Sequence, residues 1–175
     1  MIHRVLFIFL ITTSLLRAQS DMSKGFGMLE KGNFQEAELY FDEYLKTDPD
    51  NKTAKLCYGR AVGLSGEPEK ATNIFSELLK EYPGDFEIEI NYNESYLWAK
   101  EYIKAKPLYA DLVEKNPKKF GAVLGYANTL SNLKEYASAL NWVEKALALQ
   151  PDNSSAKISR KFMRLGYANE KVSNY

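Results

Sequence analysis

The sequence has very little of the chemistry on which most enzymes and metal sites depend. Its 175 residues include one cysteine, Cys57, and one histidine, His3. A disulfide framework, a Cys/His zinc site and a Cys-His catalytic pair therefore cannot be built within one chain. We expect no catalytic residue, no bound metal and no cofactor.

The chain also lacks an excess of charge of either sign. Its 23 Lys and Arg residues balance 23 Asp and Glu residues, whereas binding to a phosphate backbone requires basic side chains gathered on one face. We therefore expect no nucleic-acid partner. With 45% hydrophobic residues, the composition is typical of one compact soluble domain.

No apolar run is long enough to span a membrane. The longest, Val5 to Leu16, has about 12 residues, and a transmembrane helix needs roughly 20. Because basic residues precede this run and Ala18 follows it, residues 1–18 are typical of a cleaved secretory signal peptide. We expect the mature chain to begin at Gln19, or alternatively at Asp21, and to be periplasmic or secreted without a membrane span.

A repeat of 34 residues organises the rest of the chain. Three columns of residues share this spacing: a proline, an alanine twelve residues earlier and a bulky residue eight residues earlier. The columns are Pro49, Pro83, Pro117 and Pro151; Ala37, Ala71, Ala105 and Ala139; and Phe41, Phe75, Tyr109 and Val143. Between them, apolar residues fall three and four apart, which predicts amphipathic helices.

These columns resemble the tetratricopeptide repeat, which carries a small residue in its first helix, Ala and an aromatic residue in its second helix, and Pro at its close. The resemblance implies an all-α fold, a right-handed superhelical solenoid of antiparallel helix pairs. It divides residues 19–153 into four repeats, with boundaries 18–51, 52–85, 86–119 and 120–153. Residues 154–166 then form a capping helix, and residues 167–175 a flexible tail.

The turns and ends of the repeats follow from residue chemistry. Gly32 and Gly66 stand between the two helices of repeats 1 and 2, where a residue with positive φ commonly ends a helix. Each proline stops an outgoing helix, and a nearby Asp or Asn can cap the next one. The alanine column is expected where paired helices approach closely. Cys57 is expected to be a small buried residue rather than a reactive thiol.

The capping helix carries two kinds of residue. Ile158, Phe162 and Leu165 are expected to pack inward on the fourth repeat. The polar outer face that a terminal repeat needs is supplied by four basic residues, Lys157, Arg160, Lys161 and Arg164. A basic docking patch is the alternative interpretation of this outer face.

The resemblance also implies where a partner binds. In the family, the first helices line the inner wall of the superhelix, so that residues at equivalent positions line up across it. The ninth position here carries Phe26, Arg60, Glu94, Asn128 and Phe162. For an extended or helical peptide, we expect contacts from Phe26, Arg60, Glu94, Trp98, Asn128 and Asn132, with the aromatic side chains as anchors.

Two other interpretations of these residues stay open. Arg60 and Glu94 belong to neighbouring repeats and can pair with each other, and Trp98 can be packed at a joint between repeats. The family's clamp for a terminal carboxylate is not expected, because it uses Lys at the fifth position and Asn at the ninth. Only Asn128 matches it, since the fifth positions are Met22, Leu56, Ile90 and Leu124.

The resulting interpretation is a non-enzymatic scaffold, exported to the cell envelope, that binds a protein or peptide in a concave groove during assembly or trafficking. One alternative is the N-terminal repeat region, or a truncated copy, of a larger envelope protein. A weaker alternative is a hydrolase that uses the carboxylates of Glu87, Glu89 and Glu94, although no deep apolar pocket is expected to raise their pKa. The oligomeric state is left open.

Overall fold

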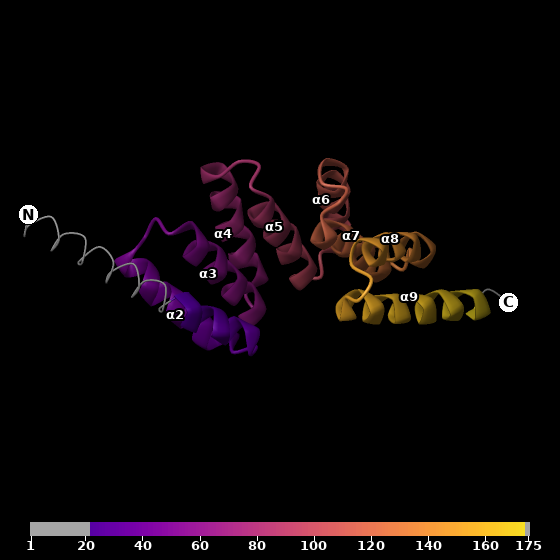
Figure 1. Ribbon diagram of the computed structural model, residues 1–175, viewed down its shortest axis with the longest axis horizontal. Helices are drawn as coiled ribbons and strands as arrows, with labels where there is room; N and C mark the ends of the chain where they lie inside the picture. The colour runs from indigo at the N-terminus through magenta and orange to yellow at the C-terminus, as the bar shows by residue number, and fades with distance from the viewer. Residues whose placement is uncertain (1–21, 174–175) are drawn as a thin grey trace, which may run out of the picture. The chain divides into compact units, whose positions relative to one another are not determined.

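The computed structural model describes residues 22–173, and its regular elements within that range are helices. Residues 22–30 form the first. It is followed by α2 (Phe34–Thr47), α3 (Lys52–Ser65), α4 (Pro68–Glu81), α5 (Phe86–Trp98), α6 (Tyr102–Lys115), α7 (Phe120–Asn132), α8 (Tyr136–Leu149) and α9 (Ser154–Ser173) (Figure 1). Short turns join helices that pack together, so neighbours run antiparallel. The prediction of an all-α fold of antiparallel helix pairs is confirmed.

The predicted signal peptide, residues 1–18, lies outside the described residues. Between residues 22 and 173, no helix is both long and apolar enough to cross a bilayer. The described chain forms two compact units, which divide between Ile74 and Phe75 within α4.

Unit 1 is held together by one apolar cluster that helix 22–30, α2 and α3 share. Ala37, Phe41, Ala54, Cys57 and Ala61 are its buried members, and Met22, Met28 and Leu29 pack against it. A Cβ atom on Gly25 would lie 2.5 Å from the Phe41 ring. The small residue of the first helix is therefore required because an aromatic ring of the second helix fills the space beside it.

Unit 2 has a core that runs through α5 to α9. α7 packs against α6 and α8 and also contacts α5 and α9. Tyr109, Leu112 and Val123 lie in one buried cluster, and Leu130 and Val143 lie in the next. As in unit 1, a small residue faces a ring, because a Cβ atom on Gly125 would overlap the ring of Tyr109.

The repeat columns coincide with the observed helix packing. All members of the alanine and bulky columns have no exposed surface, namely Ala37, Ala71, Ala105, Ala139, Phe41, Phe75, Tyr109 and Val143. Each of the four column prolines stands two residues beyond the end of a second helix. The columns therefore mark the paired-helix contacts and the helix ends, as the sequence predicts.

The turns between the two helices of a repeat share one backbone conformation. Gly32 and Gly66 have positive φ values of 77° and 115°, which confirms their predicted role. In the other two repeats the same place is taken by Lys100 and Lys134, with φ of 59° and 62°. A side chain in this left-handed region costs about 1 kcal/mol or more.

Replacing either turn lysine by glycine should therefore stabilise the protein. We expect Lys100→Gly and Lys134→Gly each to raise the free energy of unfolding by about 0.5 to 1 kcal/mol, because the relieved backbone strain exceeds the added freedom of the unfolded chain. Urea denaturation followed by circular dichroism measures the change. Lys161→Gly, within α9, is the control and should cost about 1 kcal/mol.

The last helix differs from the prediction in length and in orientation. α9 does not end at residue 166 but continues to Ser173, so the prediction of a flexible tail is wrong for residues 167–173, and residues 174–175 lie outside the described residues. It packs on the preceding helices through Ala156 and Met163, which are almost fully buried. The inward packing predicted for three other residues is also wrong, since the exposed fractions are 54%, 68% and 60% for Ile158, Phe162 and Leu165.

The physical reason is that α9 has neighbours on one side only among the described residues. It contacts α8 and α7, and a Cβ atom on Gly166 would overlap the ring of Tyr136 in α8. The side of α9 that carries small residues therefore packs against α7 and α8, where the close approach of the helices leaves no room for larger side chains. The side with the bulky apolar residues Ile158, Phe162 and Leu165 faces away from α7 and α8.

Candidate functional site

The six predicted partner-contact residues divide between the two units. Phe26 and Arg60 belong to unit 1, and Glu94, Trp98, Asn128 and Asn132 belong to unit 2. A single groove that joins all six stays a prediction, and so does a pairing of Arg60 with Glu94.

In unit 1, both predicted contact residues reach the surface. Phe26 is 38% exposed, and its ring centroid lies 6.4 Å from that of the buried Phe41, with the two planes inclined by 51°. This contact holds the Phe26 ring in place without covering it. Arg60 is exposed on α3, one turn from the buried Cys57.

The Cys57 thiol is shielded, as the sequence predicts. Burial raises the pKa of Cys57 to about 11, although the positive charge of Arg60 opposes the rise. Because the thiolate is the reactive form, we expect iodoacetamide to leave native Cys57 unmodified near neutral pH and to alkylate it rapidly in denaturant. Intact-mass measurement distinguishes the two. Rapid alkylation of the folded chain at neutral pH would show that the thiol is accessible.

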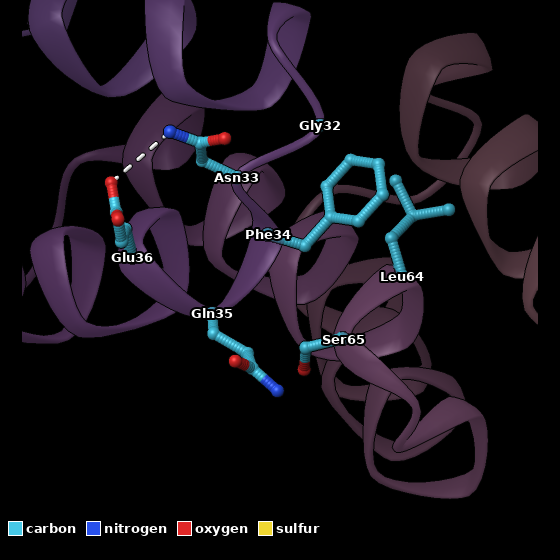
Figure 2. A pocket seen from close by; sticks show the side chains of 7 residues that line it. All are labelled: Gly32, Asn33, Phe34, Gln35, Glu36, Leu64 and Ser65. Carbon is cyan, nitrogen blue, oxygen red and sulfur yellow. Dashed lines mark hydrogen bonds between the residues drawn. The ribbon is translucent and has the colours of Figure 1, made fainter.

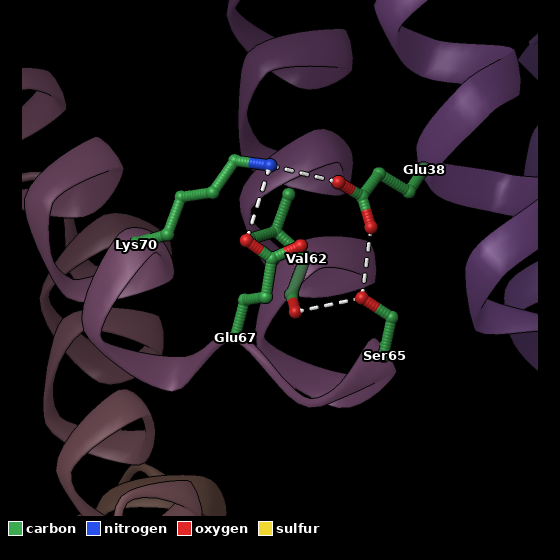
Figure 3. A network of polar contacts seen from close by, with 5 residues as sticks. All are labelled: Glu38, Val62, Ser65, Glu67 and Lys70. Carbon is green, nitrogen blue, oxygen red and sulfur yellow. Dashed lines mark hydrogen bonds and ion pairs between the residues drawn. The ribbon is translucent and has the colours of Figure 1, made fainter.

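A polar network ties α2 to α3 and to the beginning of α4 in unit 1 (Figure 3). Glu38 accepts hydrogen bonds from Lys70 Nζ at 2.9 Å and from the Ser65 hydroxyl at 2.8 Å. Lys70 also lies 3.6 Å from Glu67. Burial alone would raise the pKa of Glu38, but these hydrogen bonds outweigh it and lower that pKa. The network positions helices and leaves no carboxylate free for chemistry.

A pocket of about 380 Å³ lies beside this network, and the sequence did not predict it. It is lined by the turn after helix 22–30 and by the ends of α2 and α3, with Phe34 and Leu64 facing each other across it (Figure 2). Asn33 donates to Glu36 at 3.2 Å on its polar side. The only signal in the sequence is the turn at Gly32, because a pocket beside the turns within two repeats has no periodic pattern of its own.

In unit 2, equivalent positions on α5, α7 and α9 form a row that we call the first-helix face. α7 contacts both α5 and α9, so the ninth residues of these three helices lie on neighbouring helices. The face consists of Glu94, Trp98, Asn128, Asn132 and Phe162, which are half-buried or exposed. The chemistry of the face differs from helix to helix: α5 contributes a carboxylate and an indole ring, α7 two amides, and α9 an apolar ring.

Several of these side chains are held by neighbours. The Trp98 and Phe75 ring centroids are 6.3 Å apart, so Trp98 packs at a joint between repeats, as the alternative interpretation predicts. Trp98 remains half-buried, so part of its surface is accessible. Asn132 Nδ2 donates to the Asn128 carbonyl at 2.9 Å. Burial, together with the charge of Glu94, raises the pKa of Tyr109 far above its usual value.

A tyrosine pair on α5 also escaped the sequence analysis. The hydroxyls of Tyr92 and Tyr96 are 2.9 Å apart and their ring centroids 5.3 Å apart. The hydrogen bond between them, with burial, raises the pKa of Tyr96 to about 12. Their spacing of four residues is the signal that a search for helical side-chain pairs would have found.

The three carboxylates considered for hydrolysis lie in different surroundings. Glu87 is exposed, whereas Glu89 lines a pocket of about 160 Å³ with Asp111. Asp111 is bound by Lys115 at 2.6 Å, and Glu94 lies on the first-helix face. Among residues 22–173, no group of three or more Asp, Glu, His or Cys side chains is placed to hold a metal ion.

The described chain is thus a helical repeat protein in which pairs of antiparallel helices recur every 34 residues. The family profile described as tetratricopeptide repeat matches residues 28–90 and 96–159. The chain belongs to the tetratricopeptide repeat family. Proteins of this family are generally scaffolds that mediate protein–protein interactions and are not catalysts.

Solved structures with the same fold are distant in sequence. A thermophilic tetratricopeptide repeat protein of Thermus thermophilus, TTC0263, is 19% identical with a TM-score of 0.78, over 86% of this chain and 82% of that one. MamA of Desulfovibrio magneticus RS-1 is 20% identical with a TM-score of 0.64, over 90% and 89%. The first such domain of human RPAP3 is 18% identical with a TM-score of 0.64, over 71% and 98%. The comparison with curated proteins gives no match.

Proposed function

We propose that this protein is an exported scaffold that binds a peptide or protein segment on its first-helix face, in assembly or trafficking at the cell envelope. The observation that carries the proposal is the row of accessible side chains on α5, α7 and α9. Trp98 offers an aromatic surface held by Phe75, and Asn128 and Asn132 offer amide groups one helix away. Aromatic anchors beside polar groups are typical of peptide-binding surfaces.

The binding proposal is tested by placing a large cation on this face. We expect Asn128→Arg or Asn132→Arg to weaken binding about tenfold or more, because a guanidinium would occupy the space of the bound segment. The matched control is Asn141→Arg, at an exposed position on the second helix α8. The binding assay uses the protein captured from the native envelope fraction, with circular dichroism on the same samples. Equal loss of binding in all three variants would oppose the proposal.

Export is proposed from the composition of residues 1–18. A basic start, a short apolar run and Ala18 are typical of a leader that a signal peptidase removes. Mass spectrometry of the protein from its native host should find the N-terminus at Gln19 or Asp21. A cytosolic protein that retains Met1 would contradict export and leave the binding proposal unaffected.

A further inference from the structure

The outward side of α9 presents an apolar stripe. Ile158, Phe162, Leu165 and Val172 are 54% to 76% exposed, and their spacings of four, three and seven residues place them on one side of the helix. Phe162 also ends the first-helix face, but the stripe continues along α9 to Val172. Four bulky apolar side chains in one exposed row are unusual for a solvated helix.

Basic side chains border this stripe. Lys157, Lys161 and Arg164 follow one another at spacings of four and three residues, which places them in a row along one edge of the stripe. Residues 154–173 carry five basic residues and one acidic residue. Asp152 and Glu144 offset part of this charge by binding Lys157 at 3.1 Å and Arg164 at 3.2 Å. An occupant of the stripe must therefore offer apolar surface together with negative charge.

The same chain carries a face of that chemistry on α2. Leu39 is 73% exposed, and the residues three or four positions from it include Glu36, Asp42 and Glu43, all of them exposed. Lys46 offsets part of this charge by binding Asp42 and Glu43 at 3.4 Å and 2.8 Å. Residues 22–51 contain seven acidic and three basic residues. The two ends of the described chain are thus opposite in charge, although the whole sequence is neutral.

We propose that copies of this protein associate head to tail, with α2 of one copy docked on α9 of the next. Leu39 would insert into the apolar stripe, and Glu36, Asp42 and Glu43 would meet Lys157, Lys161 and Arg164. Pairing of α9 with α9 is disfavoured, because it sets basic residues against basic residues. Of the first-helix face, this contact uses Phe162 alone, whereas the proposed function is tested at Asn128 and Asn132 on α7.

Two physical consequences follow from this arrangement. The contact is heterologous, so a dimer keeps one unused α2 face and one unused α9 face, and growth continues beyond the dimer unless a ring closes. One helix on another buries less than the roughly 1,200 Å² of a stable interface, so association is weak and reversible. Because exposed charges carry much of the attraction, salt screens it.

Sedimentation velocity of the purified mature chain tests the proposal. At low salt, the sedimentation coefficient should rise with concentration past the value of a dimer, and high salt should abolish the rise. Two charge-reversed variants, Lys157→Glu/Lys161→Glu/Arg164→Glu and Glu36→Lys/Asp42→Lys/Glu43→Lys, should each remain monomeric. Mixed in equal amounts they should associate again, because each then offers the other a face of opposite charge.

The restored association of the mixture separates docking from damage to the fold. A parent chain that is monomeric at every concentration would overturn the proposal, as would a reversed variant that associates like the parent. It would also fail if the mixture stays monomeric while circular dichroism shows both variants folded. A monomeric parent that co-sediments with phosphatidylglycerol vesicles would assign the stripe to a membrane surface instead. Partner capture by the Asn128 and Asn132 variants is a separate readout, so failure of either proposal is distinguishable from failure of the other.

Discussion

Phe41→Ala should lower the free energy of unfolding by about 3 to 5 kcal/mol. The Phe41 ring has no exposed surface and lies at the centre of the unit 1 cluster, beside Gly25. Its removal leaves a cavity that the surrounding helices cannot fill. Since domains of this size are stable by roughly 5 to 15 kcal/mol, the variant should unfold at far lower urea concentrations.

The matched control for this substitution is Phe162→Ala. Phe162 is 68% exposed, so truncation should change stability by only about 0.5 kcal/mol. Urea denaturation of both variants, followed by circular dichroism, gives the comparison. Equal loss of stability in the two would mean that the burial assigned to the bulky column is incorrect.

Ala139→Leu in α8 should lower the free energy of unfolding by about 1 to 3 kcal/mol. Ala139 belongs to the alanine column and has no exposed surface, so a larger side chain must push α8 away from α7. Ala148→Leu adds the same atoms at an exposed position of the same helix and should be nearly neutral. Thermal denaturation gives the melting temperatures of the two variants, and equal melting temperatures would contradict the prediction.

The sequence predicts the fold well because the repeat marks positions that packing constrains. A proline two residues beyond a helix and an alanine between helices follow from local sterics, which recur in every repeat. The left-handed residue in each turn is also predictable where it is glycine. Lys100 and Lys134 show that the repeat imposes this conformation on residues that do not favour it.

The orientation of α9 was mistaken because hydrophobicity alone shows a stripe but not what covers it. The repeat register holds the missing information. The third residue of a first helix is buried whether its side chain is large or small, as Ile88, Ala122 and Ala156 show. The tenth residue is buried even where it is polar, as in Ser95 and Thr129. Both positions face the preceding repeat, so Ala156 and Met163 had to lie inward and the bulkier stripe outward.

The candidate site was less predictable than the fold. The register identifies which residues share a face, but not which of them a neighbour already holds. Trp98 illustrates the difference, because its contact with Phe75 joins residues 23 positions apart on different helices. Pockets beside the turns within repeats, such as the one beside Phe34, depend on more than one turn and leave no periodic signal.

Site-specific photo-crosslinking in the native host tests the central claim, that a partner binds the first-helix face, most directly. A benzophenone side chain would replace Asn128 or Asn132 on α7, and Asn141 on α8 as the matched control, followed by mass spectrometry of the adducts. We expect one partner protein joined to the chain at both α7 positions and absent at the α8 position. Adducts formed at Asn141 and at neither α7 position would contradict the account and place the working surface on the second helices.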